Sequence, residues 1–225
     1  MDAIVLAGGL GTRLRKTVPH CPKGLAPIKG TPFLDLLLKQ LFNSQIIDRV
    51  ILALGDRHDQ IERYYEDSPF NLEYSIEDSP LGTGGAVKLA SQLVKSPHYF
   101  VVNGDTIAPL SYQDMLDYHM TESADLTIAY GKTIDPSRYG GLLIDQGRIQ
   151  AFHEKTGTSP FVSAGVYLFS QSISFPDKSV FSIEEDLFPS LTHKKMTGYF
   201  VQSEFIDIGT ESSYTNAQEV LSCMF

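Results

Sequence analysis

The sequence predicts an α/β fold with an open, mainly parallel (mixed) sheet and helices on both faces. Three short apolar runs are typical of strands buried on both faces, because they are rich in β-branched residues and bounded by Gly or Asp. Helical patterns separate these runs, as expected of crossover connections between parallel strands. We therefore expect one domain over residues 1–225.

The first half of the chain contains the buried strands and the helices between them. We expect the strands over residues 3–6, 50–54 and 99–102. Thr31 is a suitable N-cap and Pro32 a suitable first helical residue, which predicts a helix over 33–42. Two further helices are expected over 57–66 and 84–94.

The second half combines hairpins with crossovers. Strand-like runs cover 125–130, 141–145, 161–169 and 198–201. Ser182 and Glu185 resemble a capping box for a short helix that ends near Pro189. Thr210 can cap a final helix that runs through Leu221. In an open sheet of this kind, functional residues are expected just after the carboxyl ends of the strands.

Composition and charge argue against several classes of function. The net charge of −9 and the lack of a basic run disfavour a nucleic-acid partner. No apolar segment approaches the roughly 20 residues that span a bilayer, and the N-terminus lacks a secretion-signal pattern. Cys21 and Cys223 do not make a disulfide framework. We therefore expect a cytoplasmic protein with no membrane partner, whose oligomeric state, including a homo-oligomer, stays open.

A glycine-rich segment with two cations follows the first strand. It reads Leu6, Ala7, Gly8, Gly9, Leu10, Gly11, Thr12, Arg13, Leu14, and Pro22-Lys23 follows after seven intervening residues. Closely spaced glycines let backbone N–H groups approach an anion, and Arg13 and Lys23 add positive charge. A tight turn would explain the glycines alone, but the two cations favour phosphate binding. The dinucleotide fingerprint and the P-loop do not fit this spacing.

A second glycine-rich loop lies at Gly82, Thr83 and Gly84. Its backbone N–H and C=O groups could contact the edge of a base, and Thr83 offers a hydroxyl. A glycine-rich helix entry is the alternative, and these residues alone do not separate the two interpretations.

Two carboxylates occupy positions typical of a hard-cation site. Asp105 follows the strand-like run 99–102, where a carboxylate can hold a cation that also binds water and phosphate oxygens. Asp207 lies in the apolar segment 205–208, where an unpaired charge would be unfavourable. Asp105 alone could be a turn or cap residue, but a cation shared with Asp207 would account for both.

These motifs, in this order, resemble those of the sugar-phosphate nucleotidylyltransferases over almost the whole chain. The resemblance implies a Rossmann-like fold of the nucleotide-diphospho-sugar transferase type, with a single catalytic domain. It implies catalytic roles for Arg13 and Lys23, and Mg²⁺ held by Asp105 and Asp207. The residues implied to bind the nucleotide are Leu6, Ala7, Gly8, Gly9, Gly11, Thr12, Gly82, Thr83 and Gly84.

The sugar-binding residues also follow from the resemblance. Glu154 and Lys155 look like the family's sugar-phosphate pair, in which the Glu accepts hydrogen bonds from sugar hydroxyls and the Lys holds the attacking phosphate. Without the resemblance, such a pair would be interpreted as a solvated surface pair. Gly140, Ser163 and Gly165 resemble positions in the sugar-contacting loops, although many members have Asn where Ser163 stands.

The implied reaction is an in-line attack by an oxygen of a sugar 1-phosphate on the α-phosphorus of a nucleoside triphosphate, releasing pyrophosphate. No general base is needed, because the attacking phosphate is already ionised, so catalysis would come from alignment and charge stabilisation. A non-catalytic nucleotide-sugar-binding regulatory subunit is one alternative, and the retention of both carboxylates and both cations argues against it. A cytidylyltransferase or a molybdopterin-type enzyme on a similar fold is the other.

Within the family, the compact length and the loop over 80–86 favour guanylyltransferases that act on manno-configured sugar 1-phosphates. The implied substrates are GTP and D-glycero-α-D-manno-heptose 1-phosphate, with mannose 1-phosphate second. N-acetylmuramate-1-phosphate uridylyltransferases are a further alternative. Guanine offers donors at N1 and N2 and an acceptor at O6, which the backbone of a glycine-rich loop could meet.

Overall fold

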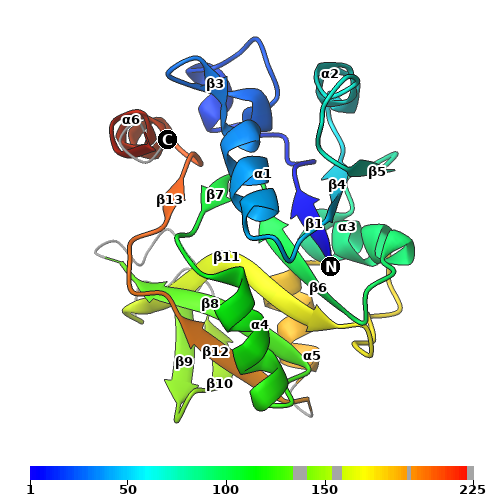
Figure 1. Ribbon diagram of the computed structural model, residues 1–225, viewed down its shortest axis with the longest axis vertical. Helices are drawn as coiled ribbons and strands as arrows, with labels where there is room; N and C mark the ends of the chain where they lie inside the picture. The colour runs from blue at the N-terminus through cyan, green and yellow to red at the C-terminus, as the bar shows by residue number, and fades with distance from the viewer. Residues whose placement is uncertain (134–140, 154–158, 192–193, 222–225) are drawn as a thin grey trace.

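The computed structural model describes residues 1–133, 141–153, 159–191 and 194–221. Within this part of the chain, nine strands form one sheet in the order β5-β4-β1-β6-β11-β8-β12-β10-β9 (Figure 1). The first four strands in this order pair in parallel, as expected for the crossover half of the fold. They are β1 (Asp2–Leu6), β4 (Arg49–Leu54), β5 (Leu72–Ile76) and β6 (His98–Asn103).

The other half of the sheet is mixed. Its strands are β8 (Leu126–Lys132), β9 (Gly141–Asp145), β10 (Arg148–His153), β11 (Phe161–Ser170) and β12 (Met196–Phe200). β11 runs antiparallel to both β6 and β8, whereas β12 runs parallel to β8. β9 and β10 form a hairpin through Gln146 and Gly147, whose positive φ values of 47° and 77° match the twist of the two strands.

Helices cover both faces of the sheet, as predicted. They are α1 (Phe33–Asn43), α2 (His58–Tyr64), α3 (Gly82–Ala90), α4 (Tyr112–Thr121), α5 (Phe188–Ser190) and α6 (Glu211–Val220). Buried side chains of α1, α2, α4 and α6 belong to one apolar core, and those of α3 and α5 belong to a second core on the opposite face. Figure 1 shows α1 and α4 on the near side of the sheet.

A small two-stranded sheet joins distant parts of the chain. β7 (Thr106–Ile107) pairs antiparallel with β13 (Ile206–Asp207), and Asp207 lies opposite Thr106. The N–H of Ile208 also donates to the carbonyl of Asp105 at 3.0 Å, an ordinary length for a backbone hydrogen bond. This pairing brings the two predicted metal-binding carboxylates to the same place.

Some local expectations were wrong. Thr31 does not cap the first helix, because it pairs with Ile28 in the hairpin of β2 (Pro27–Ile28) and β3 (Thr31–Pro32), and α1 begins at Phe33. The strands β5 and β10 and the helix α4 had no clear sequence signal. Two predicted caps are confirmed: Thr210 accepts from the N–H of Ser213, and Ser182 caps a π-helix over Ile183–Leu187. No helix in the described part of the chain has the length and apolar character that a membrane span requires.

Candidate active site

A cleft of about 870 Å³ opens at the carboxyl ends of β1, β4, β5 and β6. This volume suits a ligand of nucleotide size, and the location is the one expected for an open α/β sheet. Most of the predicted nucleotide and catalytic residues line it: Leu6, Ala7, Gly8, Gly9, Gly11, Thr12, Arg13, Lys23, Gly82, Thr83 and Asp105. The structure therefore brings the first glycine-rich segment, the second glycine-rich loop and one carboxylate together.

Glycine is required at two positions of the loop after β1. A Cβ atom on Gly8 would lie 2.8 Å from the backbone nitrogen of Gly55, so a side chain there would collide with the loop after β4. Gly11 has a φ of 57°, and a Cβ would lie 3.1 Å from the Cβ of Lys23. Among the described residues, no hydrogen bond engages the N–H groups of Gly9, Leu10 and Gly11. These donors are therefore available to an anion in the cleft.

Two cations and two carboxylates converge beside this loop. The ammonium group of Lys23 donates to the Oδ2 atom of Asp105. A Cβ atom on Gly209 would lie 3.8 Å from both the Arg13 guanidinium and the Lys23 ammonium, and 2.9 Å from Asp207 Oδ1. Residues that lie almost 200 positions apart in the chain thus surround one small space. A side chain at position 209 would fill it.

The chemistry of these carboxylates fits a Mg²⁺ site. Asp207 is 9% exposed, and its Oδ1 atom accepts hydrogen bonds from the N–H of Gly209 at 2.7 Å and the hydroxyl of Ser213 at 2.9 Å, which orient the group. No cluster of three or more His, Cys, Asp or Glu side chains suited to a metal occurs in the described ranges. Two carboxylates leave positions for water and phosphate oxygens, which is the coordination that Mg²⁺ prefers beside a nucleotide.

The loop after β5 is only partly as predicted. Gly82 and Thr83 line the cleft, and Thr83 Oγ1 also accepts from the N–H of Ile183 at 3.0 Å. Gly84 instead lies against Phe181: its N–H donates to the Phe181 carbonyl at 2.9 Å, and a Cβ would lie 2.2 Å from the ring. Gly84 is therefore glycine because Phe181 packs on it, and the geometry does not support its predicted contact with the nucleotide.

Glu77 is a cleft residue that sequence reasoning missed. It follows β5, lines the cleft, and accepts a hydrogen bond from the N–H of Leu81 at 3.1 Å. Its other carboxylate oxygen, Oε1, lies so close to Gly55 that a Cβ there would be 2.6 Å away. The rule that functional residues follow strands would have found Glu77, but β5 itself was not predicted.

The predicted sugar-binding residues are divided. Ser163 and Gly165 lie on β11, and Gly165, with a φ of 70°, packs so closely on Asn103 that a Cβ would lie 2.8 Å from its amide nitrogen. Asn103 lines the cleft, so this part of β11 adjoins it. Gly140, Glu154 and Lys155 lie outside the described residues.

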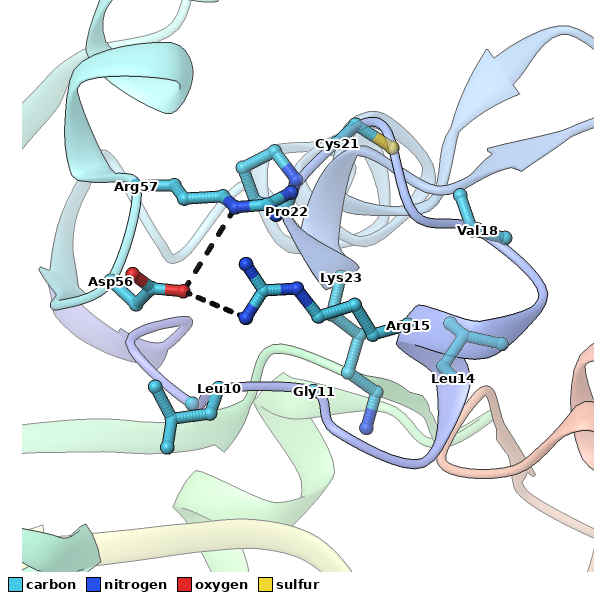
Figure 2. Close-up of a pocket in the computed structure, with 11 residues that line it drawn as sticks. Leu10, Gly11, Leu14, Arg15, Val18, Cys21, Pro22, Lys23, Asp56 and Arg57 are labelled. Carbon is cyan, nitrogen blue, oxygen red and sulfur yellow. Dashed lines mark ion pairs between the residues drawn. The ribbon is translucent and has the colours of Figure 1, made fainter.

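A charged contact ties the segment after β1 to the turn after β4. Figure 2 shows Asp56 between Arg15 and Arg57, with N···O distances of 3.7 Å and 4.0 Å. Arg57 also donates to the carbonyl of Pro19 at 3.1 Å and has the left-handed φ of 57°. Each of these contacts is partly exposed and therefore weak, but together they join the segment before Lys23 to the β4 edge of the cleft.

Comparison with known proteins agrees with this arrangement. The family model for nucleotidyl transferases matches residues 2–222. The D-glycero-alpha-D-manno-heptose 1-phosphate guanylyltransferase of Aneurinibacillus thermoaerophilus is 39% identical, and the alignment covers 98% of each chain. The enzyme of the same name from Campylobacter jejuni subsp. jejuni serotype O:2 is 36% identical, over 95% of this chain and 97% of that one.

A solved structure supports the same conclusion. HddC from Yersinia pseudotuberculosis, crystallised in complex with GMP-PN, is similar with a TM-score of 0.86 and 34% identity, over 98% of this chain and 99% of that one. The predicted nucleotide-diphospho-sugar transferase fold is thereby confirmed. The match to the family model spans nearly the whole sequence. The chain is a nucleotidyltransferase and belongs to the nucleotidyl transferase family.

Proposed function

We propose that this protein joins GTP to D-glycero-α-D-manno-heptose 1-phosphate and releases pyrophosphate, with Mg²⁺ as cofactor. The observation that carries the proposal is the convergence of the glycine-rich loop Gly8–Thr12, here called the phosphate loop, with two cations and two carboxylates beside one cleft: Arg13, Lys23, Asp105 and Asp207. The two relatives with heptose 1-phosphate guanylyltransferase names, similar over almost their full length, support the choice of substrates.

The phosphate loop and the cations would hold the triphosphate. The N–H groups of Gly9 and Gly11 can donate to its oxygens, while Arg13 and Lys23 offset the negative charge that moves onto the departing pyrophosphate. Asp105 and Asp207 would hold Mg²⁺, which, when bound, neutralises phosphate charge and fixes the orientation of the phosphate oxygens. Lys23 contacts Asp105 in the structure, so its ammonium group must turn from the carboxylate to a phosphate when substrate enters.

The sugar 1-phosphate would approach from the side of β11. An oxygen of its phosphate attacks the α-phosphorus in line with the departing pyrophosphate, and no side chain has to remove a proton, because that oxygen is already ionised. The contribution of the chain is therefore to align the two substrates and to exclude unproductive orientations. Gly165 packs on Asn103, which lines the cleft, and Ser163 lies two residues before Gly165 on β11, so this part of β11 would face the sugar.

Glu77 supports guanine as the base. A carboxylate only accepts hydrogen bonds, and guanine presents two adjacent donors, N1–H and the N2 amino group, that a carboxylate can engage together. Uracil and thymine have a single ring N–H and no amino group. Glu77 is half-buried, and a bound base that covered its carboxylate without donating to it would be unfavourable, so a wrong base should be rejected.

The experiment that tests the proposal is a pyrophosphate-release assay with every pairing of four triphosphates and three sugar 1-phosphates. GTP with heptose 1-phosphate should give the highest kcat/KM, ahead of mannose and N-acetylmuramate 1-phosphates and of UTP, CTP and dTTP. Dominant turnover of UTP would contradict the guanine assignment, and no turnover with any pair would favour the regulatory-subunit alternative. A cytoplasmic location stays a prediction, which cell fractionation would test, and the oligomeric state stays open, which sedimentation would determine.

A further inference from the structure

A chain of side-chain hydrogen bonds leads from Ser163, on the part of β11 that packs on the cleft residue Asn103, to the π-helix Ile183–Leu187. The hydroxyl of Ser163 donates to the hydroxyl oxygen of Tyr167 at 3.1 Å, and the Tyr167 hydroxyl donates to Glu184 Oε1 at 3.1 Å. Ser163 Oγ also accepts from the N–H of Gly165 at 3.2 Å. Ser163 is 6% exposed and Tyr167 is 1% exposed, so these bonds are shielded from water.

An irregularity in β11 allows the hydrogen bond between Ser163 and Tyr167 to form. In a regular strand, residues four apart lie about 13 Å from each other, too far for a serine to reach a tyrosine hydroxyl directly. Here the pairing of β11 with β8 shifts between Ser163 and Tyr167, and Gly165 between them has a φ of 70°. Bulges of this kind commonly redirect side chains beside active sites. The same irregularity packs Gly165 onto Asn103 at the wall of the cleft.

The far end of the hydrogen-bond chain is also fixed in place. Glu184 belongs to the π-helix, in which the hydroxyl of Ser182 accepts from the N–H of Glu184 at 3.2 Å. The N–H of Ile183, the residue before Glu184, donates to Thr83 Oγ1 at 3.0 Å, and Thr83 lines the cleft. Isolated π-helical turns occur frequently at functional sites. The position of the Glu184 carboxylate is thereby tied to the nucleotide side of the cleft.

The carboxylate sets the direction of the whole chain. A carboxylate accepts hydrogen bonds and does not donate them, so the single proton of the Tyr167 hydroxyl points to Glu184. Burial, with the nearby charge of Glu184, holds the pKa of Tyr167 well above its ordinary value, so the hydroxyl keeps this proton. The oxygen of Tyr167 must then accept the proton of Ser163. Ser163 can therefore offer a ligand only a lone pair.

We propose that Tyr167 and Glu184 are positioning residues for the sugar, which orient the hydroxyl of Ser163 so that it accepts a hydrogen bond from a sugar hydroxyl. The inference rests on the proposed function, because it assigns this part of β11 to the sugar 1-phosphate. The proposal adds a rule for substrate specificity. The sugar must present a hydroxyl that donates a hydrogen bond to Ser163, and a sugar with only a hydrogen-bond acceptor at that position should bind poorly.

Steady-state kinetics with GTP and heptose 1-phosphate test the proposal. Tyr167→Phe should raise the KM for the sugar phosphate about tenfold, the effect of one hydrogen bond, and change the KM for GTP less than about twofold. Because Tyr167 acts through Ser163, the same substitution made in a Ser163→Ala background should add less than about twofold. Tyr112→Phe is the matched control, since its buried hydroxyl has no hydrogen-bond partner among the described residues.

Glu184→Gln gives a second test at a position that is only half-buried. A Gln amide can donate to Tyr167 and so reverse the chain, and the sugar KM should rise several-fold while the melting temperature is kept. This variant decides the question if Tyr167→Phe does not fold. Folded variants with an unchanged sugar KM, or an equal penalty in the Ser163→Ala background, would overturn the proposal.

The proposed substrates can be wrong while the positioning roles of Tyr167 and Glu184 are right. If the wild-type enzyme releases no pyrophosphate from GTP and heptose 1-phosphate, then those substrates are wrong. The same variants are then measured with whichever sugar 1-phosphate the wild-type enzyme uses, and the same split between the two KM values confirms or overturns the positioning roles.

Discussion

The two ends of the parallel strands use charge in opposite ways. At the amino end of β1, the carboxylate of Asp2 is 4% exposed and accepts hydrogen bonds from Arg49 Nε at 2.9 Å and from the N–H groups of Lys95 at 2.6 Å and Ser96 at 3.0 Å. Arg49 also contacts Glu73 at 2.7 Å. Although burial opposes ionisation, these contacts lower the pKa of Asp2 to about 2.

The carboxyl end leaves its polar groups for a ligand. The N–H groups of Gly9 and Gly11 engage no hydrogen bond in the described chain, and Arg13 and Lys23 lie beside two carboxylates that fit a metal ion. The amino end is a closed network that stabilises the fold, whereas the carboxyl end gives up such contacts to bind substrate. Substitutions at the two ends should therefore separate stability from activity.

The largest expected effect is the loss of turnover in Asp105→Asn or Asp207→Asn. Each substitution removes a charge from the proposed Mg²⁺ site, so pyrophosphate release should fall below detection in a coupled assay while the melting temperature changes little. Removal of divalent cations with EDTA should abolish turnover of the wild-type enzyme, and added Mg²⁺ should restore it. Near-native turnover in either variant would show that its carboxylate does not hold the metal.

Lys23→Ala should have the next largest effect. Loss of one preorganised charge in the transition state lowers kcat by a factor on the order of 10² to 10³. Lys29→Ala, which removes an exposed lysine outside the cleft lining, is the control and should leave kcat unchanged. Lys155→Ala should act instead on the KM for the sugar phosphate. Equal effects of the Lys23 and Lys155 variants on GTP binding alone would contradict this division.

Glu77→Gln should change specificity more than rate. An amide can still accept one hydrogen bond but no longer pairs a negative charge with the two guanine donors, so the preference for GTP over UTP should fall about 10-fold to 100-fold. Competition between equal concentrations of the two triphosphates measures this ratio. An unchanged ratio would mean that the backbone of the loop, rather than Glu77, selects the base.

The smallest effect on activity is expected at the amino end. Asp2→Asn should lower the free energy of unfolding by about 2 kcal/mol, the value that corresponds to a pKa lowered from 3.8 to about 2, and should leave kcat and both KM values unchanged. Because the folded-state pKa is below the unfolded value, this stabilisation is present above about pH 4 and is lost as the pH falls toward 2. Urea unfolding at several pH values measures it, and a loss of activity without a loss of stability would contradict the separation.

Much of the cleft was predictable because its signals are local. Glycine spacing, strand-end carboxylates and the order of motifs identified the family, the fold and the residues from Leu6 to Lys23 that meet in the cleft. Glu77 was missed because β5, an edge strand, carries no clear alternation that would reveal it. Gly84 was assigned to the nucleotide because the sequence does not reveal what packs on it. Its actual partner, Phe181, lies almost 100 residues away in the chain. The Ser163, Tyr167 and Glu184 chain depends on a strand irregularity, which the sequence does not reveal.

The most direct test of the central claim follows the α-phosphorus of GTP. The enzyme would be incubated with heptose 1-phosphate and GTP labelled at either the α- or the γ-phosphorus, and the products separated. The α label should enter a GDP-sugar, and the γ label should leave as pyrophosphate. Release of the α label in free GMP or GDP, with no labelled sugar nucleotide, would contradict it.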